Sequence, residues 1–227
     1  MRVKQPEIIY EDDAVIVCRK EAGVAVQTAR AGQADMVSLL KNYRAKKKEE
    51  PYIGLIHRLD QPVEGVMVFA KTKQAAAKLS AQVSSRSMEK EYLAVTKGIP
   101  QSSEGKLCDW LLRDGRTNTS QVVKQETPQA KEAKLRYQVE QTDEEQQKAL
   151  VHIWLHTGRH HQIRVQFSHA GYPLVGDTKY GRETVAGRYC PVALCSCRIA
   201  FVHPVTGKEM EFTIQPKGKA FTQMVSV

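Results

Sequence analysis

Asp60 lies in a loop just before a long apolar stretch, a position at which proteins often present a reactive side chain. Asp60 follows His57 and Arg58 in residues 56–60, and a polar turn at residues 61–64 separates it from a continuous apolar stretch. A carboxylate on a loop above a buried strand can attack a substrate as a nucleophile. These residue types fit an ordinary loop aspartate beside an arginine equally well, so both interpretations stay open at this point.

A second group of basic side chains lies between residues 157 and 164. Arg159, His161 and Arg164 follow Gly158, which comes after a stretch of alternating apolar and polar residues. This pattern indicates a strand that ends in a glycine turn and leads into a helix. The exposed amides and cations of such a helix start suit a phosphate or carboxylate partner. A solvated basic turn is the alternative interpretation of the same residues.

The histidines of the same region suggest a third kind of site. Five of the seven fall in or near residues 150–161, namely His152, His156, His160, His161 and His169. In a single helix, the first three would share one face, as a zinc site requires. However, residues 150–155 alternate with the periodicity of a strand, and Gly158 would interrupt a helix. We therefore expect no metal site.

The elements that position these residues begin with a β-hairpin. In residues 8–18, apolar β-branched side chains flank an acidic turn, a pattern typical of two short strands. The spacing of apolar residues then predicts a helix over residues 36–48, a buried strand over 65–71 and a helix over 74–84. The inner stripe of this second helix would consist of Ala76, Leu79 and Val83.

The rest of the chain is predicted to be mostly antiparallel β-structure. Apolar runs separated by polar stretches predict strands over residues 91–96, 107–112, 133–139 and 150–155. A helix is expected over residues 161–170, and a last pair of strands over 196–203 and 209–215. No internal repeat, low-complexity tract or linker divides the sequence, so we expect a single domain.

The net charge narrows the class of partner. Lysine and arginine total 34 against 25 aspartate and glutamate residues, which gives a formal net charge of +9 and a pI of about 9.3. Such a charge favours polyanionic partners, either nucleic acid or an anionic membrane surface. No apolar run approaches the roughly 20 residues of a membrane-spanning helix, so we expect no membrane association. Five cysteines without a Cys-x-x-Cys pair argue against a disulfide framework and favour a reducing, cytoplasmic setting.

Several blocks of the sequence form one ordered pattern. They are residues 57–60 with Gly65 and residues 70–72, residues 90–98 with Lys90 and Tyr92, residues 157–164, residues 171–181, and a closing turn at 203–207. Together these blocks resemble the RluA-type pseudouridine synthases, and the opening residues 9–13 also fit that family. Because the blocks keep the family's order and span nearly the whole chain, the match is far more specific than any single short motif.

The resemblance implies a fold and a reaction. The expected fold is α+β, with a mostly antiparallel mixed central sheet, flanking helices and a basic active-site cleft in one catalytic domain over residues 1–227. The expected activity is the isomerisation of a uridine in structured ribosomal or transfer RNA. That reaction breaks the nitrogen–carbon glycosidic bond, turns the uracil and rejoins it through ring carbon 5, so it needs no cofactor and no metal. We expect a cytoplasmic monomer with no obligate protein partner.

The resemblance also implies roles for individual residues. Asp60 is the catalytic carboxylate, which attacks covalently or stabilises a cleaved sugar, and the sequence does not separate these routes. Arg164 would keep Asp60 ionised in a dry pocket, and Tyr92 would contact the uracil. Arg58 would fill the gap that the target base leaves in its stack. The other residues expected to bind RNA are His57, Lys90, Arg159 and His161.

Three positions depart from the family pattern. Residues 61–64 lack the small hydroxylated residue that commonly precedes the glycine, Gln166 stands where the family tends to have histidine, and Glu21 follows Lys20 where proline is expected. None of these changes removes a residue assigned to catalysis, but they bear on substrate choice. A non-catalytic RNA-binding module and a metallohydrolase built on the histidines are the competing interpretations. The sequence does not indicate which RNA or which uridine is modified.

Overall fold

The computed structural model describes residues 6–29, 32–181 and 190–225. The chain divides into two units, which we call unit 1 (Met1–Lys90 and Ser196–Gln215) and unit 2 (Glu91–Cys195 and Pro216–Val227). Each unit is therefore assembled from two separate segments of the chain. Two of the boundaries fall within strands β5 and β10, and the third lies between β11 and α4. The expectation of one domain over residues 1–227 stays a prediction.

The strands of unit 1 surround a buried central strand. They lie in the order β1 (Glu7–Glu11), β2 (Val15–Lys20), β4 (Glu64–Ala70) and β10 (Leu194–Val202), while β3 (Gly54–Leu55) pairs with β4 and β11 (Glu209–Thr213) with β10. Strand β2 runs antiparallel to β4 with Lys20 opposite Gly65. This register places the end of β2 beside the loop through which the chain enters β4, and that loop carries Asp60.

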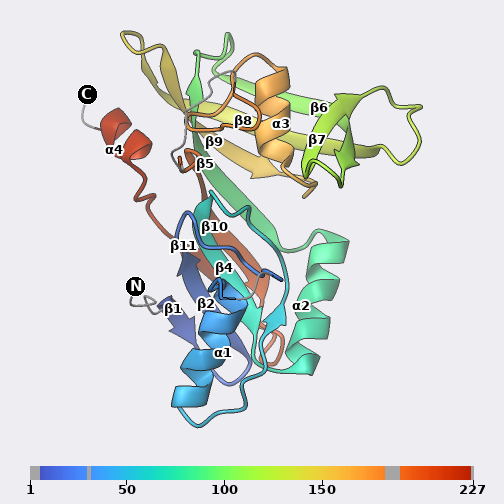
Figure 1. Cartoon of the computed structure of the whole chain (residues 1–227), viewed down its shortest axis with the longest axis vertical. Helices are drawn as coiled ribbons and strands as arrows, with labels where there is room; N and C mark the ends of the chain where they lie inside the picture. The colour runs from blue at the N-terminus through green and yellow to red at the C-terminus, as the bar shows by residue number, and fades with distance from the viewer. Residues whose placement is uncertain (1–5, 30–31, 182–189, 226–227) are drawn as a thin grey trace. The chain divides into compact units, whose positions relative to one another are not determined.

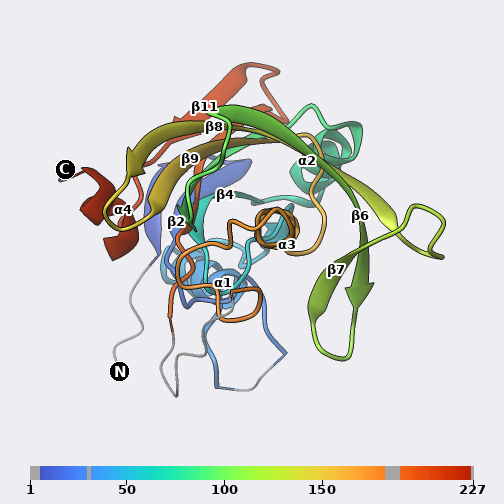
Figure 2. The same cartoon turned by 90° about the horizontal axis from the view of Figure 1, so that it is seen from above.

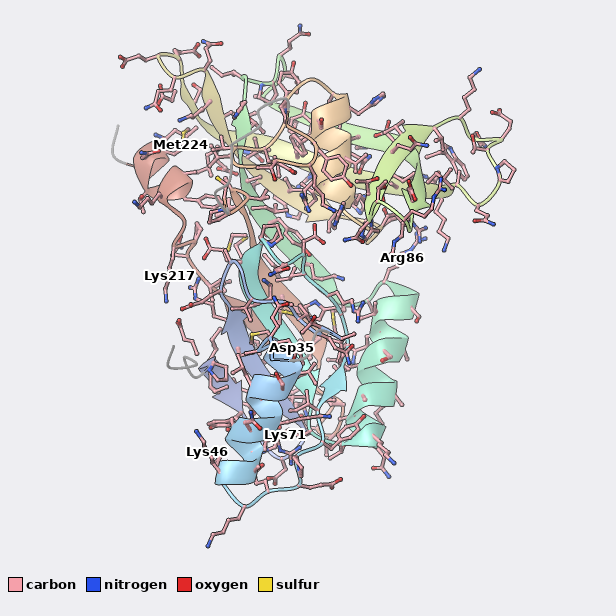
Figure 3. The ribbon with its side chains drawn as sticks, viewed as in Figure 1. Asp35, Lys46, Lys71, Arg86, Lys217 and Met224 are labelled. Atoms are coloured by element: carbon pink, nitrogen blue, oxygen red, sulfur yellow. The ribbon has the colours of Figure 1, made fainter. Side chains whose placement is uncertain are left out.

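Two helices flank the strands of unit 1. Helices α1 (Met36–Lys46) and α2 (Lys73–Ser85) lie on opposite sides of these strands in Figure 2. Asp35 begins α1 with a capping box, in which its carboxylate accepts a hydrogen bond from the Ser38 amide at 2.7 Å. In Figure 3, Asp35 and Lys46 mark the two ends of α1, and Arg86 marks the C-terminal end of α2.

The core of unit 1 confirms most of the predicted pattern. Every residue of β4 is buried, and its Val66 and Val68 pack in one cluster with Leu79 of α2. The predicted inner stripe of α2 is confirmed, because Leu79 is buried and both Ala76 and Val83 pack against the same cluster. Ala75, which is also buried in this cluster, adds one residue to the stripe.

The strands of unit 2 form an antiparallel series. Their order is β5 (Glu89–Lys97), β9 (Lys148–Leu155), β8 (Lys131–Asp143), β6 (Glu104–Asp114) and β7 (Thr119–Val123). Helix α3 (Gln162–His169) lies inside the curve of these strands, as Figure 2 shows, and α4 (Lys219–Val225) contacts β8 and β9. The predicted antiparallel middle of the chain is confirmed. The sequence did not predict β7 or α4, which are drawn in Figure 1.

Candidate active site

The Asp60 loop is fixed to unit 1 by buried neighbours on both sides. Leu59 and Val63 are buried, and the Val63 amide donates to the Asp60 carbonyl oxygen at 3.1 Å, which closes a turn. Gly65 lies two residues after Val63, and a Cβ atom at this position would meet the Cβ atom of Ser196 at 2.5 Å. The glycine thus permits a close approach of the chain just beyond the loop, while Asp60 itself stays partly exposed.

A buried lysine supports the turn that follows Asp60. The Lys20 side chain is fully buried, and its Nζ donates to the carbonyl oxygens of Glu21 at 3.1 Å, Val24 at 2.8 Å and Gln61 at 3.2 Å. Burial lowers the pKa of Lys20 to about 7, although the carboxylates of Asp60 and Glu64 favour its charged form. Lys20 thus places a cation near Asp60 and holds the backbone at the next residue.

No functional role is expected for Lys20 from the sequence alone. Its signals were the match to the lysine of the family pattern and its position at the end of β2, a strand in which all six residues are buried. A buried lysine requires partners for its ammonium, and those partners come from segments that only the folded chain brings together.

His57 lies inside unit 1 rather than on its surface. Its Nε2 accepts a hydrogen bond from the Val68 amide at 3.2 Å, so the remaining proton of the neutral ring belongs on Nδ1. Burial, together with the positive charge of Lys90, lowers the pKa of His57 to about 3. The ring is therefore neutral at pH 7 and ties the Asp60 loop to β4. Contact between His57 and RNA stays a prediction, to which this buried neutral ring adds no support.

Two other residues expected to bind RNA differ in exposure. Arg58 is exposed, and its Nη2 donates to Oε1 of Gln27 at 3.0 Å. Lys90 is half-buried, and burial lowers its pKa. An exposed guanidinium can change conformation at small cost when RNA binds, whereas a half-buried ammonium is held closer to its observed position.

Arg164 is held in unit 2 by a carboxylate that the sequence analysis did not single out. Its Nε lies 2.7 Å from Oδ2 of Asp177, and its Nη2 lies 2.8 Å from Oδ1 of the same residue. Both side chains are buried, so this fork is shielded from solvent. Asp177 also accepts hydrogen bonds from the amides of Lys179 at 3.0 Å and Tyr180 at 3.2 Å. Asp177 lies in the family block over residues 171–181, but that block did not predict that its carboxylate pairs with Arg164.

The basic residues that precede α3 make contacts within unit 2. Arg159 is partly buried, and its Nε donates to the carbonyl oxygen of Glu132 at 2.8 Å. His161 is buried, and its Nδ1 lies 2.7 Å from the hydroxyl of Tyr180. Binding of RNA by Arg159 and His161 stays a prediction, and both have structural partners in addition.

Tyr92 is the remaining residue assigned to catalysis. It is buried on β5, directly opposite Ile153 of β9, and it belongs to the same unit as Arg164. Asp60 belongs to unit 1. The assembly of Asp60, Tyr92 and Arg164 into one pocket, and the ion pair between Asp60 and Arg164, stay predictions.

Gln166 shows how unit 2 accommodates one departure from the family pattern. This residue is fully buried, and its Nε2 donates to Oδ2 of Asp109 at 2.7 Å and to the carbonyl oxygen of Ala133 at 3.2 Å. Its Oε1 accepts a hydrogen bond from Gln162 at 3.0 Å. The amide therefore anchors α3 to β6 and β8 on the inner side of the strands.

The described residues contain neither a candidate metal cluster nor a helix that could span a membrane. Among residues 6–29, 32–181 and 190–225, no group of three or more histidine, cysteine, aspartate or glutamate side chains could hold a metal ion. In the same part of the chain, no helix has the length and apolar character needed to cross a membrane.

Comparison with known proteins identifies the family. The family model described as RNA pseudouridylate synthase matches residues 14–169, a stretch that contains Asp60, Tyr92 and Arg164. The chain therefore belongs to the RNA pseudouridylate synthase family, and the resemblance to its RluA-type members is confirmed.

Curated relatives are similar over most of the chain. Ribosomal large subunit pseudouridine synthase D of Vibrio cholerae is 33% identical over 219 residues, which cover 90% of this chain and 65% of the relative. Ribosomal large subunit pseudouridine synthase C of Escherichia coli is 33% identical over 210 residues, which cover 89% of this chain and 64% of the relative. The chain thus spans slightly less than two thirds of the length of these relatives.

Solved structures confirm the predicted fold. Human RNA pseudouridylate synthase domain containing 4 has a TM-score of 0.76 at 26% identity, with coverage of 93% of this chain and 89% of that chain. Human RNA pseudouridylate synthase domain containing 1 has the same TM-score at 23% identity and covers 95% of this chain. The fold is the α+β pseudouridine synthase fold, with a mixed, mostly antiparallel sheet and flanking helices.

Proposed function

We propose that this chain is an RNA pseudouridine synthase that isomerises a uridine in structured RNA, with Asp60 as its catalytic carboxylate. The observation that carries the proposal is the family match over residues 14–169. This stretch contains the turn that carries Asp60, the buried Lys20 that donates to the Gln61 carbonyl oxygen beside it, and Arg164, which is paired with Asp177. A bare RNA-binding module has no need for a carboxylate held beside a buried lysine. The proposal includes action in a single domain, as a monomer and in the cytoplasm.

Asp60 acts at the sugar of the target nucleotide. As the bond between uracil nitrogen 1 and the sugar breaks, the carboxylate attacks the sugar or stabilises its positive charge. The uracil then turns and forms a bond from ring carbon 5 to the sugar, which in the covalent route breaks the bond between the sugar and Asp60 and releases the carboxylate. The proton of carbon 5 is lost as nitrogen 1 gains one. Arg164 pairs with Asp60 and favours its ionised form, which both routes require.

Tyr92 and Arg58 act on the base. The aromatic ring of Tyr92 stacks on the uracil, and its hydroxyl assists removal of the proton from carbon 5. A target base in folded RNA must leave its stack, at a cost of a few kcal/mol. Arg58 is exposed next to the Asp60 loop, and its guanidinium offsets part of that cost by filling the gap. Arg159, His161, Lys90 and His57 complete the proposed RNA contacts.

The names of the relatives suggest which RNA is the substrate. The names of the relatives in Vibrio cholerae and Escherichia coli refer to the large ribosomal subunit. We therefore place ribosomal RNA of the large subunit first among the candidate substrates and transfer RNA second. The net charge of +9 supports binding to either RNA through salt-sensitive phosphate contacts.

Mapping of pseudouridine in cells that lack this gene tests the proposal. We expect at least one uridine of the large-subunit ribosomal RNA to remain unmodified, and the intact gene to restore its modification. Purified protein should then modify the same uridine in RNA isolated from the deletion cells. Unchanged maps of both ribosomal and transfer RNA, together with no product from the purified protein, would contradict the proposed function.

A further inference from the structure

The guanidinium of Arg164 has a second neighbour besides Asp177. The Cζ atom of Arg164 lies 5.2 Å from the centre of the Tyr180 ring, within the range of a cation–π contact. Asp177 contacts one edge of the guanidinium through Nε and Nη2. The fork fixes that edge, and the ring of Tyr180 lies over the group. Together these contacts define the plane in which Arg164 presents its remaining N–H groups.

The position of the Tyr180 ring is in turn fixed by its hydroxyl. The backbone amide of Ser120, on β7, donates to the Tyr180 oxygen at 2.8 Å. Nδ1 of His161 lies 2.7 Å from the same hydroxyl, and the tautomer of the imidazole sets which of the two groups donates. Two hydrogen bonds, one with Ser120 and one with His161, therefore hold the Tyr180 hydroxyl. A phenylalanine at position 180 would keep the ring but lose both bonds.

His161 and its neighbour close this network back onto β7. The rings of His160 and His161 stack with centroids 3.7 Å apart, and Nδ1 of His160 lies 2.9 Å from Oγ of Ser120. His161 has a φ of 54°, a left-handed conformation that costs free energy for a residue other than glycine. The stack and the bond to Tyr180 hold this conformation, one turn of helix before Arg164.

We propose that Tyr180 is a positioning residue for Arg164, with β7 as its anchor through Ser120 and with His161 as the second hydrogen-bond partner of its hydroxyl. This inference rests on the proposed function, in which Arg164 pairs with the Asp60 carboxylate. It gives β7, which the sequence did not predict, a part in catalysis. It also gives His161 a role that needs no direct contact with RNA.

A purely structural tyrosine would behave differently from a positioning residue. Its loss would lower the free energy of unfolding and the fraction of active protein, while the kcat of the folded enzyme would be unchanged. If the loss did affect kcat, the factor would not depend on the residue at position 164. A double-mutant cycle between positions 180 and 164 separates these cases, because a residue that acts through Arg164 has nothing to position once Arg164 is replaced.

The experiment uses the full chain with Tyr180→Phe, Tyr180→Leu, Arg164→Lys and the double variant Tyr180→Leu/Arg164→Lys. The release of tritium from RNA that carries uridine labelled at carbon 5 gives kcat, filter binding gives the Kd for RNA, and urea unfolding gives stability. Tyr172→Phe is the matched control, because its hydroxyl also accepts a backbone N–H, from Gln101 at 3.3 Å, but Tyr172 has no part in the site.

We expect Tyr180→Leu to lower kcat by about tenfold and Tyr180→Phe by about threefold, with the Kd for RNA changed by less than about twofold. Arg164→Lys should lower kcat by about 100-fold or more, because an ammonium cannot reproduce the fork. The double variant should be no slower than Arg164→Lys alone. Tyr172→Phe should match the wild type.

An equal loss of kcat on replacing Tyr180 in both backgrounds would overturn the positioning role and leave the proposed function intact. Normal kcat in Arg164→Lys would instead contradict the role of Arg164 in the proposed function and the inference with it. If Tyr180→Leu does not fold, the cycle is completed with Tyr180→Phe, for which an additive result overturns the inference in the same way.

Discussion

Arg164 and Asp177 form a buried fork in which two N–H groups of one guanidinium meet both oxygens of one carboxylate, at 2.7 and 2.8 Å. The carboxylate fixes the direction of the guanidinium, since a fork permits far less rotation than a single contact. Asp177 thus supports Arg164, a residue that the family resemblance assigns to catalysis. This role of Asp177 became visible only in the folded chain.

Replacement of Asp177 should show how much the fork stabilises unit 2. Asp177→Asn removes the charge of one partner from this buried ion pair, and breaking such a pair costs about 3–5 kcal/mol. Urea unfolding should report a loss of this order, with kcat lowered as well because Arg164 loses its orientation. Asp13→Asn is the control, since Asp13 is an exposed aspartate, and we expect it to unfold like the wild type. Equal stability of the two variants would refute the structural importance of the fork.

Lys20 should affect turnover without affecting the affinity for RNA. Lys20→Met keeps an aliphatic chain in the buried space but removes the donor to three carbonyl oxygens, one of them at Gln61 beside Asp60. We expect kcat to fall by about tenfold or more while the Kd for RNA stays within about twofold. Lys73→Met, a change at an exposed lysine, provides the comparison and should retain full turnover. Equal kcat in the two variants would refute the support that Lys20 gives to the Asp60 turn.

Lys20 also predicts a dependence of stability on pH. Its pKa is about 7 in the folded protein and 10.5 in the unfolded chain, so the unfolded state binds more protons between these values. The free energy of unfolding should therefore contain a component that rises with pH from about 7 to about 10.5. Lys20→Met should remove this component, and an unchanged slope in the variant would show that Lys20 is not its source.

Glu11 should make unit 1 sensitive to acid. Burial raises the pKa of its carboxyl group, but hydrogen bonds from Lys71, Lys47 and Tyr43 outweigh burial and lower the pKa to about 2. A depressed carboxyl pKa contributes stability that is present above the unfolded value of 4.5 and is lost as pH falls towards about 2. Glu11→Gln should abolish this part of the acid dependence in unfolding measured across that window. If the free energy of unfolding falls equally steeply with pH in the wild type and the variant, the acid dependence arises from other groups.

The sequence predicted the elements with strong periodicity. Residues 65–70 form a continuous apolar run, and residues 150–155 alternate as a half-buried strand does, so both were assigned correctly as strands. Strand β7 (Thr119–Val123) was missed because it is only five residues long, is partly polar and follows a stretch that resembles a loop. Helix α4 has only seven residues, and its position depends on tertiary contacts with β8 and β9.

The candidate site was only partly predictable for a different reason. The family motifs indicated Asp60, Tyr92 and Arg164, because these residues occur in recognisable blocks. The partners of Arg164 and the role of Lys20 depend on contacts between distant segments, such as Lys20 with Gln61, which spacing along the chain does not encode. His57 was expected to bind RNA, yet the fold buries its ring and uses it as an acceptor for Val68.

Replacing the carboxylate itself tests the catalytic role of Asp60 most directly. Asp60→Asn keeps the size of the side chain and removes its negative charge, while Asp13→Asn makes the same change at an exposed aspartate. With RNA from cells that lack the gene, we expect Asp60→Asn to form pseudouridine at least about a thousandfold more slowly than wild type and to bind that RNA within about twofold of it. Asp13→Asn should match the wild type in both. Undiminished pseudouridine formation by Asp60→Asn would contradict the account.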